Sequence, residues 1–256
     1  MTKKTVYEQP LNERIRTFLR LEFLFARAAH HLRATSTWDS RATLSSLLEI
    51  LSIFGRSDLK TEVLKELERH MASLGRLEPN PDIDQGRLQQ VLEELEKLSG
   101  RLHKSDGPIA SDLKANEFLT GIQQRSAIPG GTCDFDLPAY HHWLQQPAKC
   151  RTRDLAEWLG RFEVIASAIQ LILQLIRESA VAQKVTAESG FFQKTLDPNL
   201  PCQMVRVLVS RNLPYFAEIS GGRHRFTVRF MTCSEIDGHA RQAAQDVAFE
   251  LACCII

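Results

Sequence analysis

Charged and apolar side chains alternate along residues 221–230, GGRHRFTVRF. After two glycines, Arg223, Arg225 and Arg229 fall on one parity. The other parity holds His224, Phe226, Val228 and Phe230. Because successive side chains of a strand point to opposite faces, this pattern predicts a half-buried strand. Its exposed face would carry like charges about 7 Å apart, an arrangement that is unfavourable without a partner of opposite charge.

Helical periodicity dominates the chain before this region. Apolar residues recur every three or four positions, which is the spacing of helices with one buried face. Helices are predicted over 13–33, 39–54, 58–75, 84–102, 112–125 and 152–179, with a short one that begins at Pro138. Gly75 ends one of these helices, and the sequence EPNPDID at 78–84 forms the loop to the next.

Strand-like runs appear after Gly190, separated by turn residues. The predicted strands cover 202–210, 215–220, 223–233 and 246–254, and shorter ones are predicted over 3–8 and 132–137. Helices and strands are therefore segregated along the chain, which predicts the α+β class. We expect an α-helical domain over 12–182, interrupted by the short strand at 132–137. An antiparallel β-strand domain over 184–256 would be joined by strand 3–8, and the 132–137 strand would also enter its sheet.

Charge is unevenly distributed, although the net charge of the 256 residues is only +1. Residues 1–56 hold nine basic and five acidic side chains, whereas residues 57–104 hold eight and ten. Residues 201–231 hold five arginines against Glu218 alone. If the two basic segments meet in space, they form an anion-binding site. The low overall charge argues against bulk binding to nucleic acid or to a membrane surface.

The composition, 43% hydrophobic and 25% charged, is that of a water-soluble globular protein. The N-terminus lacks the apolar run of a signal peptide. The most apolar stretch, 159–176, contains Arg161 and Glu163 and is too polar for a membrane span. The six cysteines show no disulfide framework. We therefore expect a cytoplasmic protein with reduced thiols and no direct membrane insertion.

Motifs for catalysis, cofactors and metals are not found in the sequence. It has no phosphate-binding loop and no zinc or calcium spacing, and the His30–His31 and His141–His142 pairs point about 100° apart on a helix. Cys133 follows Pro-Gly-Gly and has His141 nearby in sequence, which raises the alternative of a thiol enzyme. No family signature supports that alternative. We expect no enzymatic activity, no cofactor and no metal.

The arginines remain as candidate binding residues. Arg16, Arg20 and Arg27 lie within roughly 40° of one another on the first helix, so a second basic face accompanies the strand. Arginine suits bidentate capture of carboxylate or phosphate, and arginine clusters commonly bind acidic motifs. Two alternatives stay open at this point: a solvated face with weak salt bridges, and a nucleic-acid-binding module that uses the same arginines on phosphates.

Six blocks of the sequence together resemble the ZapD family of bacterial division proteins. They are YEQPLNERIRTFLRLEFLF (7–25), TEVLKELERH (61–70), SAIPGGTCDFDLPAYHHWL (126–144), LILQLIRES (171–179), ISGGRHRFTVRFM (219–231) and FELACC (249–254). The blocks extend over nearly the whole chain. The resemblance implies a non-enzymatic homodimer that binds the C-terminal tail of FtsZ, the tubulin-like division GTPase, and bundles its protofilaments at the mid-cell division ring.

The resemblance also implies a fold with a helical domain, a β-strand domain and a positively charged groove between them. Carried over by matching position, the residues that would bind the FtsZ tail are Arg16, Arg20, Arg56, Lys114, His141, Arg225 and Arg229. Arg223 is added because the alternation puts it on the same strand face as Arg225. The segment ASDLKANEFLT at 110–120 departs from the arginine-rich pattern of the family, with Glu117 near an expected basic position.

Overall fold

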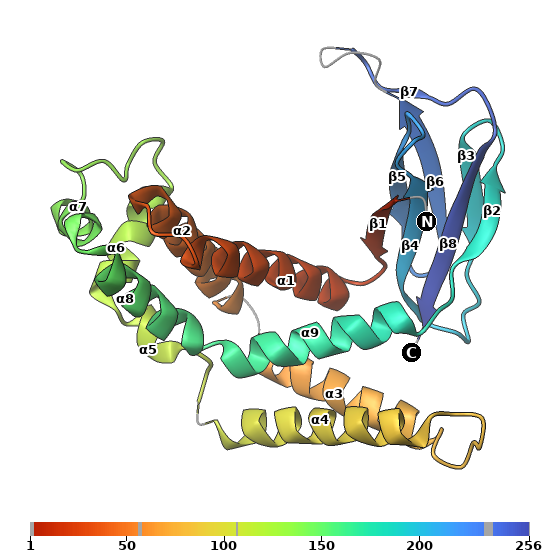
Figure 1. Ribbon diagram of the computed structural model, residues 1–256, viewed down its shortest axis with the longest axis horizontal. Helices are drawn as coiled ribbons and strands as arrows, with labels where there is room; N and C mark the ends of the chain where they lie inside the picture. Colours follow the sequence, from red (N-terminus) through yellow and green to blue (C-terminus); the bar gives the residue numbers. More distant parts are fainter. Residues whose placement is uncertain (1–2, 56–57, 106, 233–237, 256) are drawn as a thin grey trace. The chain divides into compact units, whose positions relative to one another are not determined.

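The computed structural model describes residues 3–55, 58–105, 107–232 and 238–255 (Figure 1). The chain forms two compact units, one made of residues 1–18 and 173–256 and the other of residues 19–172. The first unit contains all the described strands, and the second is helical. Two helices, α1 (Glu13–Leu32) and α9 (Glu163–Glu178), each begin in one unit and end in the other. The α+β class predicted from the sequence is confirmed.

The β unit consists of two antiparallel sheets. The first has the strand order β1-β4-β8-β2, and the second has the order β3-β6-β5 with β7 paired to β6. Their bounds are β1 Lys4–Pro10, β2 Gln183–Ala187, β3 Phe191–Thr195, β4 Cys202–Ser210, β5 Phe216–Gly221, β6 Arg225–Thr232, β7 Arg241–Gln242 and β8 Val247–Ile255. The predicted N-terminal strand is confirmed, since β1 pairs along its whole length with β4.

The core of this unit lies between the inner faces of the two sheets. Phe226, Val228 and Phe230 of β6 are fully buried, as the alternation in the sequence predicted. They meet residues of the other sheet, and the rings of Phe230 and Phe249 lie 5.0 Å apart. Burial of this alternating face fixes the register of β6, because a slip of one residue would turn its arginines into the core.

A tight turn precedes β6 and corrects one prediction. The backbone N–H of Gly222 donates to the carbonyl of Arg225, so Arg223 and His224 form the loop of the β5–β6 hairpin. Arg223 is therefore not on the strand face, and His224 is exposed rather than buried. The first glycine has a packing reason: a Cβ atom on Gly221 would approach the Cβ of Phe226 to 2.8 Å.

A carboxylate joins three elements of the β unit. Glu8 of β1 accepts hydrogen bonds from Arg177 at the end of α9, at 2.9 and 2.8 Å, and from Arg206 of β4 at 3.0 Å. The Arg206 guanidinium also donates to the carbonyl of Arg177, 3.3 Å away. All three side chains are about one-fifth exposed. The shared Glu8 carboxylate thus offsets the repulsion between the two guanidinium groups.

Helices make up the second unit. Besides parts of α1 and α9 it holds α2 Thr37–Phe54, α3 Leu59–Gly75, α4 Gln85–Lys104, α5 Ser111–Lys114, α6 Glu117–Ser126, α7 Pro138–Gln145 and α8 Ala148–Gly160. Helices α3 and α4 form a pair joined by the predicted loop near 78–84. The core includes Phe162, whose ring lies 5.1 Å from that of Phe54 and 6.1 Å from that of Phe25.

Three predicted elements of this region are wrong. Residues 132–137 form turns rather than a strand, because Cys133 donates to Gly130 and Leu137 donates to Cys133 along the backbone. The helix predicted over 112–125 is broken, since the side chain of Asn116 accepts from the N–H of Leu119 and starts a new helix. The helix predicted over 152–179 is two helices, α8 and α9, bent by 64° after Gly160.

Arg151 is a buried cation that the described residues hold by hydrogen bonds without an ion pair. Its guanidinium donates to the carbonyls of Thr35, Leu144 and Gln146 and to the hydroxyl of Ser40. The first and last of these acceptors adjoin the start of α2, and the other two end α7. One side chain therefore satisfies carbonyl groups at the C-terminal end of α7, which lack partners within that helix, and links them to the start of α2.

His70 of α3 is buried, and its Nε2 atom has no hydrogen-bond partner within the described structure. Burial, and then the Arg69 cation, lower the pKa of His70 from 6.5 to about 4, although the Glu66 carboxylate opposes this change. The folded protein therefore keeps this imidazole neutral over a range of pH in which the unfolded chain binds a proton.

We expect Glu8→Gln to lower the free energy of unfolding by about 2 kcal/mol, because the change leaves two half-buried guanidinium groups without their shared anion. Thermal unfolding followed by circular dichroism measures this loss. The matched control is Glu250→Gln, which removes the partner of Lys4 in a more exposed pair and should cost less than about 1 kcal/mol. Equal melting temperatures for the two variants would contradict the proposed difference.

Stability should fall as the pH decreases from 6.5 towards 4, because only the unfolded chain then protonates His70. Above pH 6.5, His70 is neutral in both the folded and the unfolded state, so it does not reduce stability. Near pH 4, the free energy of unfolding is lower by roughly 3 kcal/mol. Urea unfolding followed by the fluorescence of Trp38, Trp143 and Trp158, all in the helical unit, measures it. His70→Leu should flatten this part of the pH dependence, and His103→Leu, on the exposed surface, should leave it unchanged.

Candidate functional site

Arg225 and Arg229 are the exposed cations of β6. They stand on the outer face of the strand, on either side of Thr227, and are separated by about 13 Å along it. No described acidic side chain lies within ion-pair distance of either guanidinium. The alternation GGRHRFTVRF therefore produces an outer face with two available cations and an inner face that builds the core.

The strands beside β6 determine what else a ligand would meet on this face. Glu218 of β5 is the cross-strand partner of Arg229, and Phe191 of β3 is its partner on the other side. Glu218 is exposed, and the Phe191 side chain is 38% exposed. We name this surface of Phe191, Glu218, Arg225, Thr227 and Arg229 the β6 face. It offers two guanidinium groups, one carboxylate and an apolar ring.

The positive charge of residues 201–231 is smaller at the surface than the sequence suggests. Arg206, counted among its five arginines, is half-buried and bonded to Glu8. The Glu218 carboxylate lies beside Arg229 in the sheet. Binding charge is thus concentrated on Arg225, Arg229 and the exposed turn residue Arg223, with Arg211 elsewhere in the segment.

The basic residues predicted on α1 differ from one another in their contacts. Arg16 donates to the Glu13 carboxylate one turn earlier, at 3.1 Å. Arg20 is exposed and lines a pocket of about 310 Å³ with Phe23 and Glu49. Arg27, which the sequence placed on the same helix face, is bound to α2 through Ser46 and Glu49. Arg27 therefore joins two helices.

Two other predicted residues, Lys114 and His141, belong to the helical unit. The Lys114 ammonium group donates to the carbonyl of Phe54 at 3.0 Å, so it closes the last turn of α2. Arg56, two positions later in the sequence, lies outside the described residues. His141 is exposed on α7, and its backbone N–H donates to Leu137.

The predicted residues thus divide between the two units. Arg16, Arg223, Arg225 and Arg229 belong to the β unit, and Arg20, Lys114 and His141 belong to the helical unit. Within the β unit, the fold brings Arg225 and Arg229 onto one face. Within the helical unit, Lys114 reaches the end of α2. A groove that joins residues of both units remains a prediction from the resemblance.

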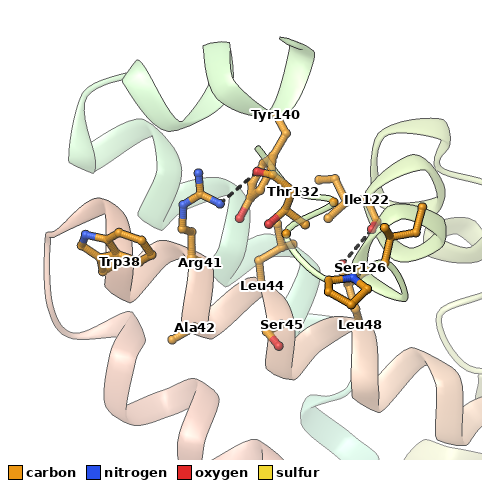
Figure 2. Close-up of a pocket in the computed structure, with 14 residues that line it drawn as sticks. Trp38, Arg41, Ala42, Leu44, Ser45, Leu48, Ile122, Ser126, Thr132 and Tyr140 are labelled. Carbon is orange, nitrogen blue, oxygen red and sulfur yellow. Dashed lines mark hydrogen bonds between the residues drawn. The ribbon is translucent and has the colours of Figure 1, made fainter. Parts of the chain in front are cut away.

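A pocket of about 520 Å³ in the helical unit contains none of the predicted residues. Figure 2 shows Arg41 at this pocket, between the indole of Trp38 and the ring of Tyr140. The Arg41 guanidinium lies 5.5 and 5.0 Å from the centres of these rings and donates to the carbonyl of Thr132. Burial raises the pKa of Tyr140, an effect that Arg41 partly opposes. The cation is thus already satisfied by protein groups.

Sequence reasoning missed this pocket because its parts are far apart in the chain. Trp38 and Arg41 come from α2, and the opposite wall is the turn at 128–132. The SAIPGG motif at 126–131 forms a tight turn that requires glycine at position 131. A Cβ atom on Gly131 would lie 2.4 Å from the carbonyl oxygen of Arg125. The motif therefore has a structural reason in this fold.

The described residues contain no group of three or more His, Cys, Asp or Glu side chains that could hold a metal ion. None of their helices is by itself long and apolar enough to cross a membrane, and only the bent pair α8–α9 reaches that length and composition together.

Comparison with known proteins identifies the family. A family model named ZapD, described as a cell division protein, matches residues 19–229. The chain belongs to the ZapD family. A ZapD protein of Methylococcus capsulatus is 45% identical over 256 residues, and the alignment covers the full length of both chains.

Further relatives show the same full-length match. ZapD of Coxiella burnetii is 36% identical over 251 residues, which are 98% of this chain and 97% of the relative. ZapD of Chromobacterium violaceum is 37% identical over 248 residues, with 97% and 98% covered. Each of these relatives is named a cell division protein, and no catalytic activity is part of that name.

Proposed function

We propose that this protein is a non-enzymatic division factor that binds the C-terminal tail of FtsZ and, as a homodimer, cross-links FtsZ protofilaments in the cytoplasm at the mid-cell ring. The observation that carries the proposal is the β6 face, where two arginines have no described ion-pair partner in a member of the ZapD family. A surface of this kind favours a ligand with carboxylates.

The composition of the β6 face supports a peptide rather than a bare anion. Phe191 lies directly beside Arg229 in the sheet, so a ligand that reaches this arginine also meets an exposed apolar ring. An acidic peptide with an apolar side chain would satisfy both. The restricted extent of the cationic surface is less suited to nucleic acid, whose binding generally uses many phosphate contacts over a broad basic stripe.

The remaining tail contacts are assigned by the resemblance. Arg16, Arg20, Arg56 and His141 would contact the tail together with Arg225 and Arg229, and Lys114 and Arg223 are additional candidates. Lys114 would contribute mainly by holding the end of α2, since its ammonium group is bonded to Phe54. In this proposal the tail is bound by charge and apolar contact, and neither a cofactor nor a metal takes part.

Bundling would follow from the number of tail-binding sites in the dimer. A twofold dimer presents two equivalent tail sites, and a filament displays many tails. Ordering a short disordered peptide limits the affinity of one site. Binding by both sites of a dimer raises the effective affinity by about 10²–10⁴ without new contacts. Because the contacts are charged and exposed, added salt should weaken bundling.

Co-sedimentation with polymerised FtsZ tests the proposal. The protein is mixed with cognate FtsZ and GTP, using either full-length FtsZ or FtsZ without its C-terminal tail, and the pellet is quantified. We expect pelleting with full-length filaments only. Equal pelleting with both would exclude the tail as the ligand, and electrophoretic shift of DNA and RNA would then test the nucleic-acid alternative.

Arg225→Glu should reduce the affinity for the tail about tenfold or more, because it removes one cation and adds a repulsive charge on the β6 face. The melting temperature should stay close to that of the wild type, since the side chain is exposed. Lys184→Glu makes the same change in net charge on the other sheet of the β unit. Fluorescence anisotropy of a labelled tail peptide compares the two variants, and equal weakening would make the effect one of net charge alone.

Glu218→Gln should strengthen tail binding by about two- to fivefold, because it removes the carboxylate that stands beside Arg229. The same anisotropy measurement, at low and at high salt, checks the change. High salt should reduce the gain, since the interaction is between exposed charges. Weaker binding by this variant would indicate that Glu218 itself contacts the tail.

A further inference from the structure

Two cysteines of the β unit lie on neighbouring strands. Cys202 is the first residue of β4, and Cys253 is near the end of β8, which pairs with β4 in an antiparallel arrangement. The register pairs Val205 with Cys253 and Met204 with Cys254. It then shifts, so that Cys202 pairs with Ile255.

This shift determines which way Cys202 points. In an unbroken strand, Cys202 would share the face of Met204, and Cys253 would point to the opposite face. The irregularity between Cys202 and Met204 adds one residue and reverses that parity. Both thiols consequently pack against the same hydrophobic core between the sheets. They are diagonal neighbours across the two strands, because Cys202 pairs with Ile255 and Cys253 lies two residues before it on the same face.

The neighbouring cysteine does not share this arrangement. Cys254 points to the outer face of the sheet and is fully buried. Burial raises its pKa to about 11. Cys202 and Cys253, in contrast, are half-buried, so small molecules have access to this end of the strand pair. The described residues thus hold one pair of adjacent, partly accessible thiols.

The surroundings assign different roles to the two sulfurs. The Cys202 thiol donates a hydrogen bond to the backbone carbonyl of Met204, 3.4 Å away, so its proton already has an acceptor. The Cys253 side chain, and next burial, raise the pKa of Cys202. The Cys202 side chain, and next the Lys194 ammonium group, lower the pKa of Cys253 despite its partial burial. Cys253 is therefore the better nucleophile, and Cys202 keeps its proton.

We propose that Cys202 and Cys253 form a reversible oxidation site, in which a peroxide converts the two thiols into a disulfide between β4 and β8. The Cys253 thiolate attacks one oxygen of the peroxide, the O–O bond breaks, and Cys253 becomes a sulfenic acid while the other oxygen leaves as water or alcohol. The Cys202 sulfur then attacks Cys253, its proton goes to the departing hydroxyl, and water is released. The two thiols lose two electrons, and the peroxide gains them.

Closing the disulfide requires only a small movement. Diagonal neighbours in a sheet have Cα atoms about 7–8 Å apart, and a disulfide needs less than about 7 Å. Cys202 is at the very start of β4, after Pro201, so an approach of about 1 Å involves a strand end rather than the centre of the sheet. The bond would link the last strand of the chain to β4, which also holds β1.

Peptide mapping after mild oxidation tests this inference. The reduced full-length protein is treated with low concentrations of hydrogen peroxide, remaining thiols are alkylated, and the digest is analysed by mass spectrometry. We expect a peptide pair joined through Cys202 and Cys253, reversed by dithiothreitol, with the protein still migrating as a single chain on a non-reducing gel. The exposed Cys133 serves as the control for accessibility alone.

Variants separate the two roles. Cys202→Ser should leave the Cys253 sulfenic acid without a resolving thiol, so a dimedone adduct accumulates at Cys253. Cys253→Ser should abolish the disulfide and slow oxidation at this site at least several-fold, whereas Cys133→Ser should behave like the wild type. The inference is overturned if Cys202 and Cys253 are alkylated separately after peroxide treatment, or if Cys133 is oxidised first. Tail binding is not part of this readout, so the result is independent of the proposed function.

Discussion

The β unit depends on the shared carboxylate of Glu8. Its two guanidinium partners come from the end of a helix and from a central strand, and the carboxylate itself comes from the first strand of the chain. Without this anion, two half-buried cations would face each other at the point where three elements meet. The shared anion explains how the first sheet accommodates Arg206 beside Arg177 in a partly buried position. The arginines of β6 lie in the second sheet and do not take part in this contact.

The arginines of this protein therefore have two different roles. Arg151, Arg177, Arg206 and Arg27 are bound by backbone carbonyls, hydroxyls and carboxylates, and they connect helices and strands. Arg225 and Arg229 have no such partner among the described residues and stand on a rigid strand. A sum of charges over a segment cannot distinguish these roles. The burial of each arginine and its hydrogen-bond partners do distinguish them. They show that the exposed positive charge of β6 is confined to Arg225 and Arg229.

The sequence predicted most where one local rule decides the outcome. Period-two alternation located β6, and β4 has the predicted bounds, because each strand places apolar residues in a core. The short strands β2 and β3 were missed, since Lys184, Gln193 and Lys194 disguise their alternation. Residues 132–137 alternate too, but local turn hydrogen bonds determine their structure. The partner of Arg206 is 198 positions away, and no local pattern could reveal it.

The pairing of β1 with β4 also has a consequence for how the protein is made. The first strand leaves the ribosome early, but the strand that it pairs with is about 200 residues later and cannot be reached until most of the chain has been synthesised. The helical unit is continuous in sequence and can fold in the meantime. The β unit is then completed last, by the pairing of β1 with β4, so it has the slow, non-local folding step.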